Sequence, residues 1–136
     1  MRILICGSRT WTDKKAILDK LLSVEASYDS YIKTVIHGGA RGADTLAGIA
    51  TKEMCGYKAD ANHTQAQVDD NTPAVLVFPA NWNKYGRAAG AIRNQQMLTE
   101  GRPDLVLAFW DQKSRGTKHM IELAKRAGVP VEVITK

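Results

Sequence analysis

Short apolar runs alternate with longer amphipathic stretches along this chain, and that alternation constrains its fold more than any other feature. The apolar runs predict strands at residues 2–6, 34–36, 74–78, 104–110 and 131–134. Between them, apolar side chains recur at helical spacing over residues 12–24, 44–55, 86–101 and 117–127. A strand–helix unit repeated four times before a last strand predicts an α/β fold, in which helices cover both faces of a parallel sheet.

The loop after the second predicted strand has the pattern of an anion-binding turn. It begins at Gly38 and Gly39, carries Arg41, and leads into a helix within five residues. Glycines allow the backbone to approach a ligand closely, and the first amide groups of a helix lack partners within the helix. Arg41 adds a planar, charged donor for phosphate, and Asp44 is a candidate cap for the helix. A tight turn with a surface arginine would use the same residues, so this loop alone does not decide the function.

Three other segments combine glycine with arginine in the same way. They are residues 7–10 (Gly-Ser-Arg-Thr), 86–94 (Gly-Arg-Ala-Ala-Gly-Ala-Ile-Arg-Asn) and 114–117 (Ser-Arg-Gly-Thr). The carboxyl ends of parallel strands lie at one edge of a sheet, where ligands bind. We therefore expect these loops to meet at that edge, with their arginines placed to recognise phosphate or carboxylate. Gly86 and Gly90 each cost a helix about 1 kcal/mol relative to alanine, which favours a close backbone approach to a ligand there.

Composition limits the classes of protein to which the chain can belong. Its 136 residues suit one domain, and its hydrophobic and charged shares of 44% and 24% are typical of a soluble globular protein. No apolar run approaches the roughly 18 residues of a membrane span, so we expect a cytoplasmic protein with no membrane partner. The formal net charge of +5 fits an anionic partner but does not by itself indicate nucleic acid.

The cysteines and histidines form no metal-binding pattern. Cys6 and Cys55 lie far apart without a CxxC motif, and His37, His63 and His119 form no HxxxH or HExxH motif. We expect two reduced, packed thiols, no metal and no cofactor. His37 follows a predicted strand and is expected to be a buried core histidine.

Four sequence blocks now stand in order: residues 7–10, 38–44 (Gly-Gly-Ala-Arg-Gly-Ala-Asp), 86–94 with Met97, and 114–117. This set resembles the SLOG superfamily of Rossmann-like nucleotide-binding proteins, and within it the YspA/YpsA-related proteins of phages and bacteria. The resemblance covers nearly the whole of a single domain, residues 1–136, apart from a polar stretch near 58–73 that looks like an insertion. The expected fold is a Rossmann-like three-layer fold with about five parallel strands in the order 3-2-1-4-5.

Other members of the superfamily suggest what the shared pocket does. DprA proteins bind single-stranded DNA, LOG enzymes hydrolyse the N-glycosidic bond of nucleoside 5′-monophosphates, and some SLOG domains bind ADP-ribose-derived signals. The LOG loop Pro-Gly-Gly-x-Gly-Thr-x-x-Glu is similar to residues 113–120, but Met120 stands at the glutamate position. Methionine cannot transfer a proton, and Glu122 lies about 200° further around a helix. The resemblance therefore favours binding over LOG-type hydrolysis.

We expect a protein that binds a small nucleotide or an ADP-ribose-like derivative, in a sensor or sequestering role. The alternatives are a nucleotide-processing N-glycosidic hydrolase of LOG type and a DprA-like binder of single-stranded DNA. No catalytic residue is assigned, and relatives imply a homodimer or higher homo-oligomer. Trp82 is a candidate to stack on a base, and Asp111 to bind ribose, act as a base or steady Arg115. The residues expected to bind the ligand are Gly7, Ser8, Arg9, Thr10, Gly38, Gly39, Ala40, Arg41, Gly42, Asp44, Trp82, Arg93, Asn94, Asp111, Ser114, Arg115, Gly116 and Thr117.

Overall fold

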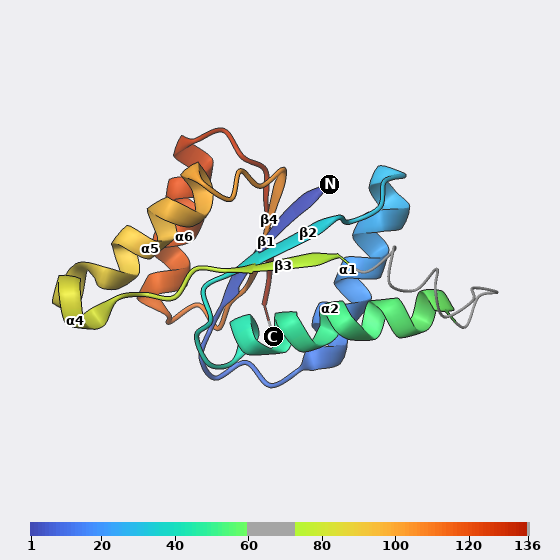
Figure 1. The fold of residues 1–136 in the computed structure, drawn as a ribbon, viewed down its shortest axis with the longest axis horizontal. Helices are drawn as coiled ribbons and strands as arrows, with labels where there is room; N and C mark the ends of the chain where they lie inside the picture. Colours follow the sequence, from blue (N-terminus) through green and yellow to red (C-terminus); the bar gives the residue numbers. More distant parts are fainter. Residues whose placement is uncertain (60–72, 136) are drawn as a thin grey trace.

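Five parallel strands form one sheet in the order β3-β2-β1-β4-β5, which confirms the predicted order (Figure 1). The computed structural model describes residues 1–59 and 73–135. Strand β1 lies at the centre and pairs with β2 on one side and with β4 on the other, so the loops after these three strands are neighbours. The strands are β1 (Arg2–Gly7), β2 (Thr34–His37), β3 (Ala74–Val77), β4 (Leu105–Phe109) and β5 (Val131–Ile134).

Helices cover both faces of the sheet, which confirms the three-layer α/β fold. Helices α1 and α2 lie on one face, and α5 and α6 lie on the other (Figure 1). No helix in the described part of the chain is both long and apolar enough to cross a membrane. The helices are α1 (Lys14–Tyr28), α2 (Ala43–Ala59), α4 (Trp82–Tyr85), α5 (Ala89–Thr99) and α6 (Arg115–Arg126), with a short 3-10 segment, η1 (Gly86–Ala88), before α5.

The central strand β1 contributes to two hydrophobic cores. Ile3 and Ile5 pack into the cluster formed with α1 and α2, whereas Leu4 and Cys6 pack into the cluster formed with α5 and α6. Successive side chains of a strand point to opposite faces, so a strand covered on both faces needs a continuous apolar run. Burial of each aliphatic side chain contributes roughly 1.5–3 kcal/mol before the entropy of folding is counted. These two cores fix the end of β1, from which the first loop of the site begins.

Strand β3 forms as predicted, but the prediction that it is buried is wrong. Leu76 and Val77 are 37% and 49% exposed. Among the described strands β3 pairs with β2 alone, because it lies at the edge of the sheet. An apolar run shows that a strand can form, but it does not show where in the sheet that strand lies. The strand also ends at Val77, one residue earlier than predicted.

The third helical region, predicted over residues 86–101, is present, but it is not one regular helix. The segment begins earlier with α4, passes through η1, and becomes regular only in α5. Asn81 caps α4 by accepting a hydrogen bond from the Lys84 amide at 3.1 Å, and Gly86 ends it with φ 55° and ψ −130°. A Cβ atom at Gly86 would meet nothing within 4 Å, so this glycine meets a conformational requirement rather than a steric one.

Two boundaries of the other helices differ from expectation. Asp13 caps α1, accepting from the Ala16 amide at 3.0 Å, and the helix continues to Tyr28, beyond the predicted end at residue 24. Helix α2 runs to Ala59, beyond the predicted end at residue 55. The expected insertion at 58–73 falls mainly outside the described residues, as do His63 and the side chain of Cys55.

Candidate functional site

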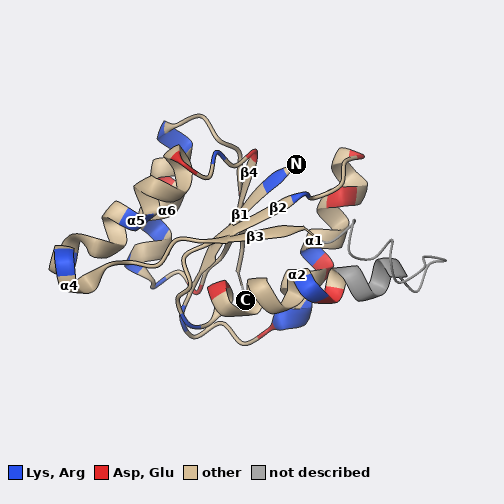
Figure 2. Ribbon diagram, in the orientation of Figure 1, with Lys and Arg blue, Asp and Glu red and all other residues tan. Residues whose placement is uncertain are grey.

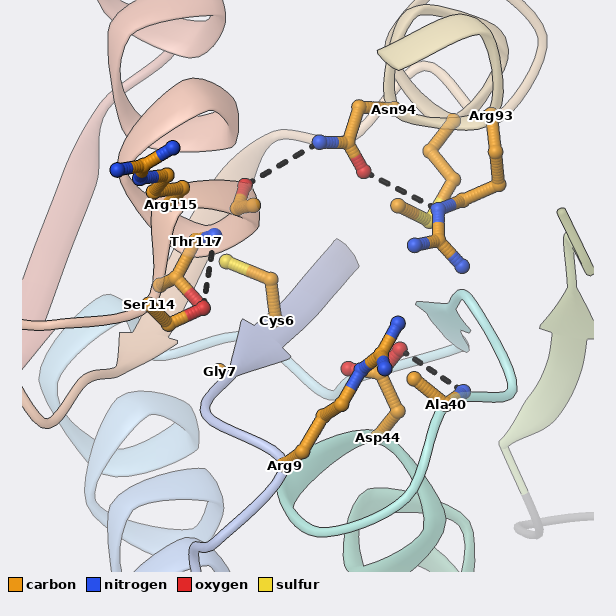
Figure 3. Close-up of a pocket in the computed structure, with 12 residues that line it drawn as sticks. Cys6, Gly7, Arg9, Ala40, Asp44, Arg93, Asn94, Ser114, Arg115 and Thr117 are labelled. Carbon is orange, nitrogen blue, oxygen red and sulfur yellow. Dashed lines mark hydrogen bonds between the residues drawn. The ribbon is translucent and has the colours of Figure 1, made fainter. Parts of the chain in front are cut away.

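The loops after β1, β2 and β4 meet helix α5 around a hollow at the carboxyl edge of the sheet, as predicted (Figure 3). The hollow has a volume of about 270 Å³. In Figure 2, basic residues lie on the turns beside this edge of the sheet. The lining residues are Cys6, Gly7, Arg9, Ala40, Asp44, Arg93, Asn94, Met97, Ser114, Arg115, Gly116 and Thr117.

Two arginines reach into this hollow from opposite sides. Arg9 comes from the loop after β1, and Arg93 comes from α5 (Figure 3). Burial lowers the pKa of the Arg93 guanidinium; Asp44 opposes that shift, and the nearby charge of Arg9 adds to it. Arginine stays protonated under such conditions, so two like charges face each other across the hollow. The side chain of Arg9 makes no hydrogen bond or ion pair with any residue that the structure describes.

Arg93 is held by a hydrogen-bonded network that joins three elements. Its Nη1 donates to the Gly38 carbonyl at 2.8 Å, and its Nε donates to Asn94 Oδ1 at 3.1 Å. The amide nitrogen of Asn94 then donates to the Gly116 carbonyl at 3.3 Å and lies 3.1 Å from His119 Nδ1. A side chain at Gly38 would collide with this arrangement, because a Cβ atom there would lie 2.2 Å from Arg93 Nη1. The network therefore fixes α5 against the loop after β2 and against the start of α6.

Asp44 lies in the wall of the hollow and is 5% exposed. Its Oδ2 accepts hydrogen bonds from the amides of Gly38 at 3.1 Å and Ala40 at 3.3 Å. Asp44 therefore holds the loop that precedes its helix, and its side chain accepts from loop amides rather than from the amides of the first turn of α2. Burial raises its pKa to about 6, although the Ala40 amide and Arg93 oppose that shift.

The start of α6 forms the opposite wall. Ser114 caps the helix: its Oγ accepts from the Thr117 amide at 3.3 Å and from the Thr117 hydroxyl at 3.0 Å. The amides of Arg115 and Gly116 have no acceptor among the described residues. A Cβ atom at Gly116 would meet nothing within 4 Å, so the space in front of this helix is open.

Ser8, Thr10 and Asp111 were expected to contact the ligand, but none of them lines this hollow. Ser8 is buried, and its hydroxyl accepts from the Asp111 amide at 2.9 Å. The carboxylate of Asp111 accepts from the amides of Lys113 and Ser114, both at 2.8 Å, which lowers its pKa. Thr10 lies 3.5 Å from the same carboxylate. These groups hold the loops together, and a carboxylate with a lowered pKa is a poor general base.

A second hollow of about 280 Å³ adjoins the first and shares Arg9, Arg93 and Ala40 with it. The expected residues Arg41 and Trp82 lie here rather than in the first hollow. Gly42 lines neither of these two hollows; its φ is 73°, and a Cβ there would lie 2.4 Å from the carbonyl oxygens of Ser8 and Arg9. The remaining residues that line the second hollow are Gly38, Gly39, Arg41, Pro79, Ala80 and Trp82.

Four lining residues were not in the predicted set: Cys6, Met97, Pro79 and Ala80. Burial raises the pKa of the Cys6 thiol, so this group stays neutral. No local pattern distinguishes these residues from core or loop positions. His37 is buried as expected, its pKa is lowered by burial, and its Nδ1 accepts from the Gly39 amide at 3.0 Å. Met120 is fully buried in the core with α5, so the side chain at the LOG glutamate position does not line the hollow.

Comparison with known proteins places the chain in a family. A model of the "YspA, cpYpsA-related SLOG family" matches residues 1–53, which include β1, α1, β2 and the first part of α2. The "Gene 61 protein" of Mycobacterium phage D29 is 37% identical over 130 residues, covering 96% of this chain and 93% of that protein. No solved structure matches the chain significantly. The chain therefore belongs to the YspA, cpYpsA-related SLOG family.

Proposed function

We propose that the chain binds a small phosphate-bearing, nucleotide-derived ligand in the first hollow, as a sensor or a sequestering protein. The observation that supports this most is the pair of guanidinium groups of Arg9 and Arg93. Like charges repel in a partly buried site, whereas an anion between them removes the repulsion and forms charge-assisted hydrogen bonds. Arg93 uses only two of its nitrogens within the described protein, so donors remain for a ligand.

The opposite wall supports the same ligand chemistry. The open amides of Arg115 and Gly116 lie at the positive end of α6, and Arg115 adds another charge. Three arginines and one carboxylate thus line the hollow, so its net charge is positive. A nucleotide-derived ligand is the choice because the SLOG resemblance implies one and because an adjoining hollow can hold the rest of the molecule.

Hydrolysis of the bound nucleotide is the second candidate function, and Asp44 is the observation that favours it. Asp44 is the one carboxylate among the described lining residues, and a pKa of about 6 suits a group that exchanges a proton near neutral pH. Its two hydrogen bonds from loop amides give it a structural role as well. Release of free base from AMP or ADP, lost in Asp44→Asn, would select this candidate over simple binding.

The experiment that tests binding compares Arg9→Ala with Arg126→Ala. Both changes remove one positive charge from an exposed arginine, but Arg126 lies in the last turn of α6, away from the hollow. Affinities for pyrophosphate and ADP are measured by calorimetry, and stability by thermal melting. At a hundredfold excess over its dissociation constant, a ligand stabilises the protein by about 2.7 kcal/mol, which for this size is a melting shift on the order of 10 °C.

We expect Arg9→Ala to lose about 1.5–3 kcal/mol of binding free energy, a ten- to hundredfold drop in affinity, with little change in stability. Arg126→Ala should bind as the parent protein does. Failure of the parent protein to bind any phosphate compound would refute the proposal. Tight binding of an oligonucleotide with a steep salt dependence, and none of nucleotides, would instead support the DprA-like alternative.

A further inference from the structure

The second hollow shares one wall with the first, which we call the anion hollow, and of the two it alone has an aromatic ring among its described lining residues. Arg9 and Arg93 line both, so the two spaces meet at the pair of guanidinium groups. The first hollow continues toward the start of α6. The second continues toward Trp82 and the turn after β3, where Pro79 and Ala80 add apolar surface. A ligand whose charged part lies between the arginines would therefore reach the side chain of Trp82 on one side only.

Trp82 is suited to present a ring to such a ligand. Its side chain is 50% exposed. It is the first residue of α4, a helix whose start is capped by Asn81. The ring rests against α5, where its Cη2 atom would lie 3.5 Å from a Cβ atom at Gly90. Support from one side and exposure on the other is the arrangement in which an aromatic side chain stacks on a base.

We propose that Trp82 stacks on the base of a nucleoside diphosphate or its derivative, while the phosphates pass between Arg9 and Arg93 into the anion hollow. This inference rests on the proposed function, since it assumes that phosphate occupies the first hollow. It adds the orientation of the ligand: base toward α4 and phosphates toward α6. Inorganic pyrophosphate would fill the anion hollow and leave the ring uncovered, so the two kinds of ligand separate the two contributions.

The test measures ADP, GDP, UDP and pyrophosphate affinities by calorimetry for the parent chain and for Trp82→Ala, Trp82→Phe and Tyr85→Ala. Tyr85 is the matched control, because it is a 40% exposed aromatic residue of the same helix that does not line the second hollow. Stacking on an aromatic ring tolerates any base, so the three nucleotides should respond alike. In the parent chain, nucleotides but not pyrophosphate should also quench the fluorescence of the exposed tryptophan.

Trp82→Ala should weaken nucleotide binding about five- to a hundredfold and leave pyrophosphate binding within about twofold. Trp82→Phe should recover part of the loss, and Tyr85→Ala should change neither ligand. Equal nucleotide affinity in the parent chain and Trp82→Ala would overturn the stacking role while leaving the anion site intact. An equal loss for pyrophosphate would overturn it too, because the effect would then be structural. A parent chain that binds neither class would overturn both proposals.

Discussion

Two helices, α2 and α6, begin at the same edge of the sheet with a glycine near the first turn, yet the amides at their N-termini are partnered to different degrees. At α2, the Ala43 amide donates to the Ser8 carbonyl, and the Thr45 amide donates to the Ala40 carbonyl. The Asp44 carboxylate accepts hydrogen bonds from two amides of the loop before the helix. At α6, Ser114 caps a single turn and leaves open space beside Gly116. More of the amides at the loop with the stronger sequence motif are thus partnered within the protein itself.

This difference shows what a glycine motif can and cannot indicate. In the loop before α2, Gly42 brings the backbone close to another loop. In the first turn of α6, Gly116 leaves space that nothing in the described protein fills. The same residue type therefore supports packing at one helix and access at the other.

Gly42→Ala should destabilise the fold by about 2–4 kcal/mol. The new Cβ atom would lie 2.4 Å from two backbone carbonyl oxygens, and φ there is 73°, so crowding and backbone strain add. Urea denaturation measures the change. The matched variant Gly116→Ala should keep or slightly raise the free energy of unfolding, because alanine favours a helix. Equal destabilisation by the two changes would remove the contrast between the loops.

Asp44 should make stability depend on pH. Its pKa is raised from 3.8 to about 6 in the folded chain, so the folded state holds the proton more tightly than the unfolded state. The stabilisation is complete below about pH 4 and is lost as the pH rises through 6, by roughly 2–3 kcal/mol. Asp44→Asn lacks this titration, so unfolding free energies of the two proteins should diverge between pH 4 and 7. A difference that stays constant over that range would contradict the assignment.

Gly116→Ala should weaken pyrophosphate binding by up to about tenfold, since a methyl group would enter the space in front of α6 that the ligand is proposed to use. The free energy of unfolding of this variant provides the control, because it should not fall. Calorimetry that finds unchanged affinity would place the anion elsewhere in the hollow.

Arg41→Ala should have the smallest effect on pyrophosphate, less than about threefold. Arg41 is exposed and lines the second hollow, whereas Arg9 lines both. An exposed charge at the margin of a site contributes little to the binding free energy, because water and salt screen its attraction for the ligand. A loss as large as that of Arg9→Ala would move the anion toward the loop before α2, where the sequence motif predicts it.

The sequence predicted the fold well because the information for it is local and repeated. The apolar run of β1 and the helical spacing after it require a covered parallel sheet, and both cores were confirmed. The exposure of β3 was not predictable from its apolar run, which resembles that of β4, because position in the sheet depends on pairing over long distances. The break at Gly86 was missed because helical spacing continues on either side of it.

The sequence predicted that the glycine- and arginine-bearing loops meet at one edge of the sheet, but it did not predict the role of each residue. Gly7, Arg9, Arg93 and Gly116 line the first hollow, as the loop motifs suggested. Ser8 and Asp111 have the residue types of ligand contacts, yet the Ser8 hydroxyl accepts from the Asp111 amide, and the Asp111 carboxylate accepts from two amides of its own loop. Asp44 was expected to cap a helix and instead binds the loop before it. Such differences depend on which polar group lies within hydrogen-bond distance of a given amide in the folded chain. Sequence spacing does not contain that information.

Phosphate is proposed to bind at the open start of α6 between Arg9 and Arg93, and not in the loop before α2. This placement can be tested with amide NMR spectra of the ¹⁵N-labelled chain, recorded while pyrophosphate is added. We expect large, saturable shifts of the Arg115 and Gly116 amides, and small shifts of the Gly38 and Ala40 amides, which Asp44 already binds. Large shifts of Gly38 and Ala40 with none at Gly116 would contradict it.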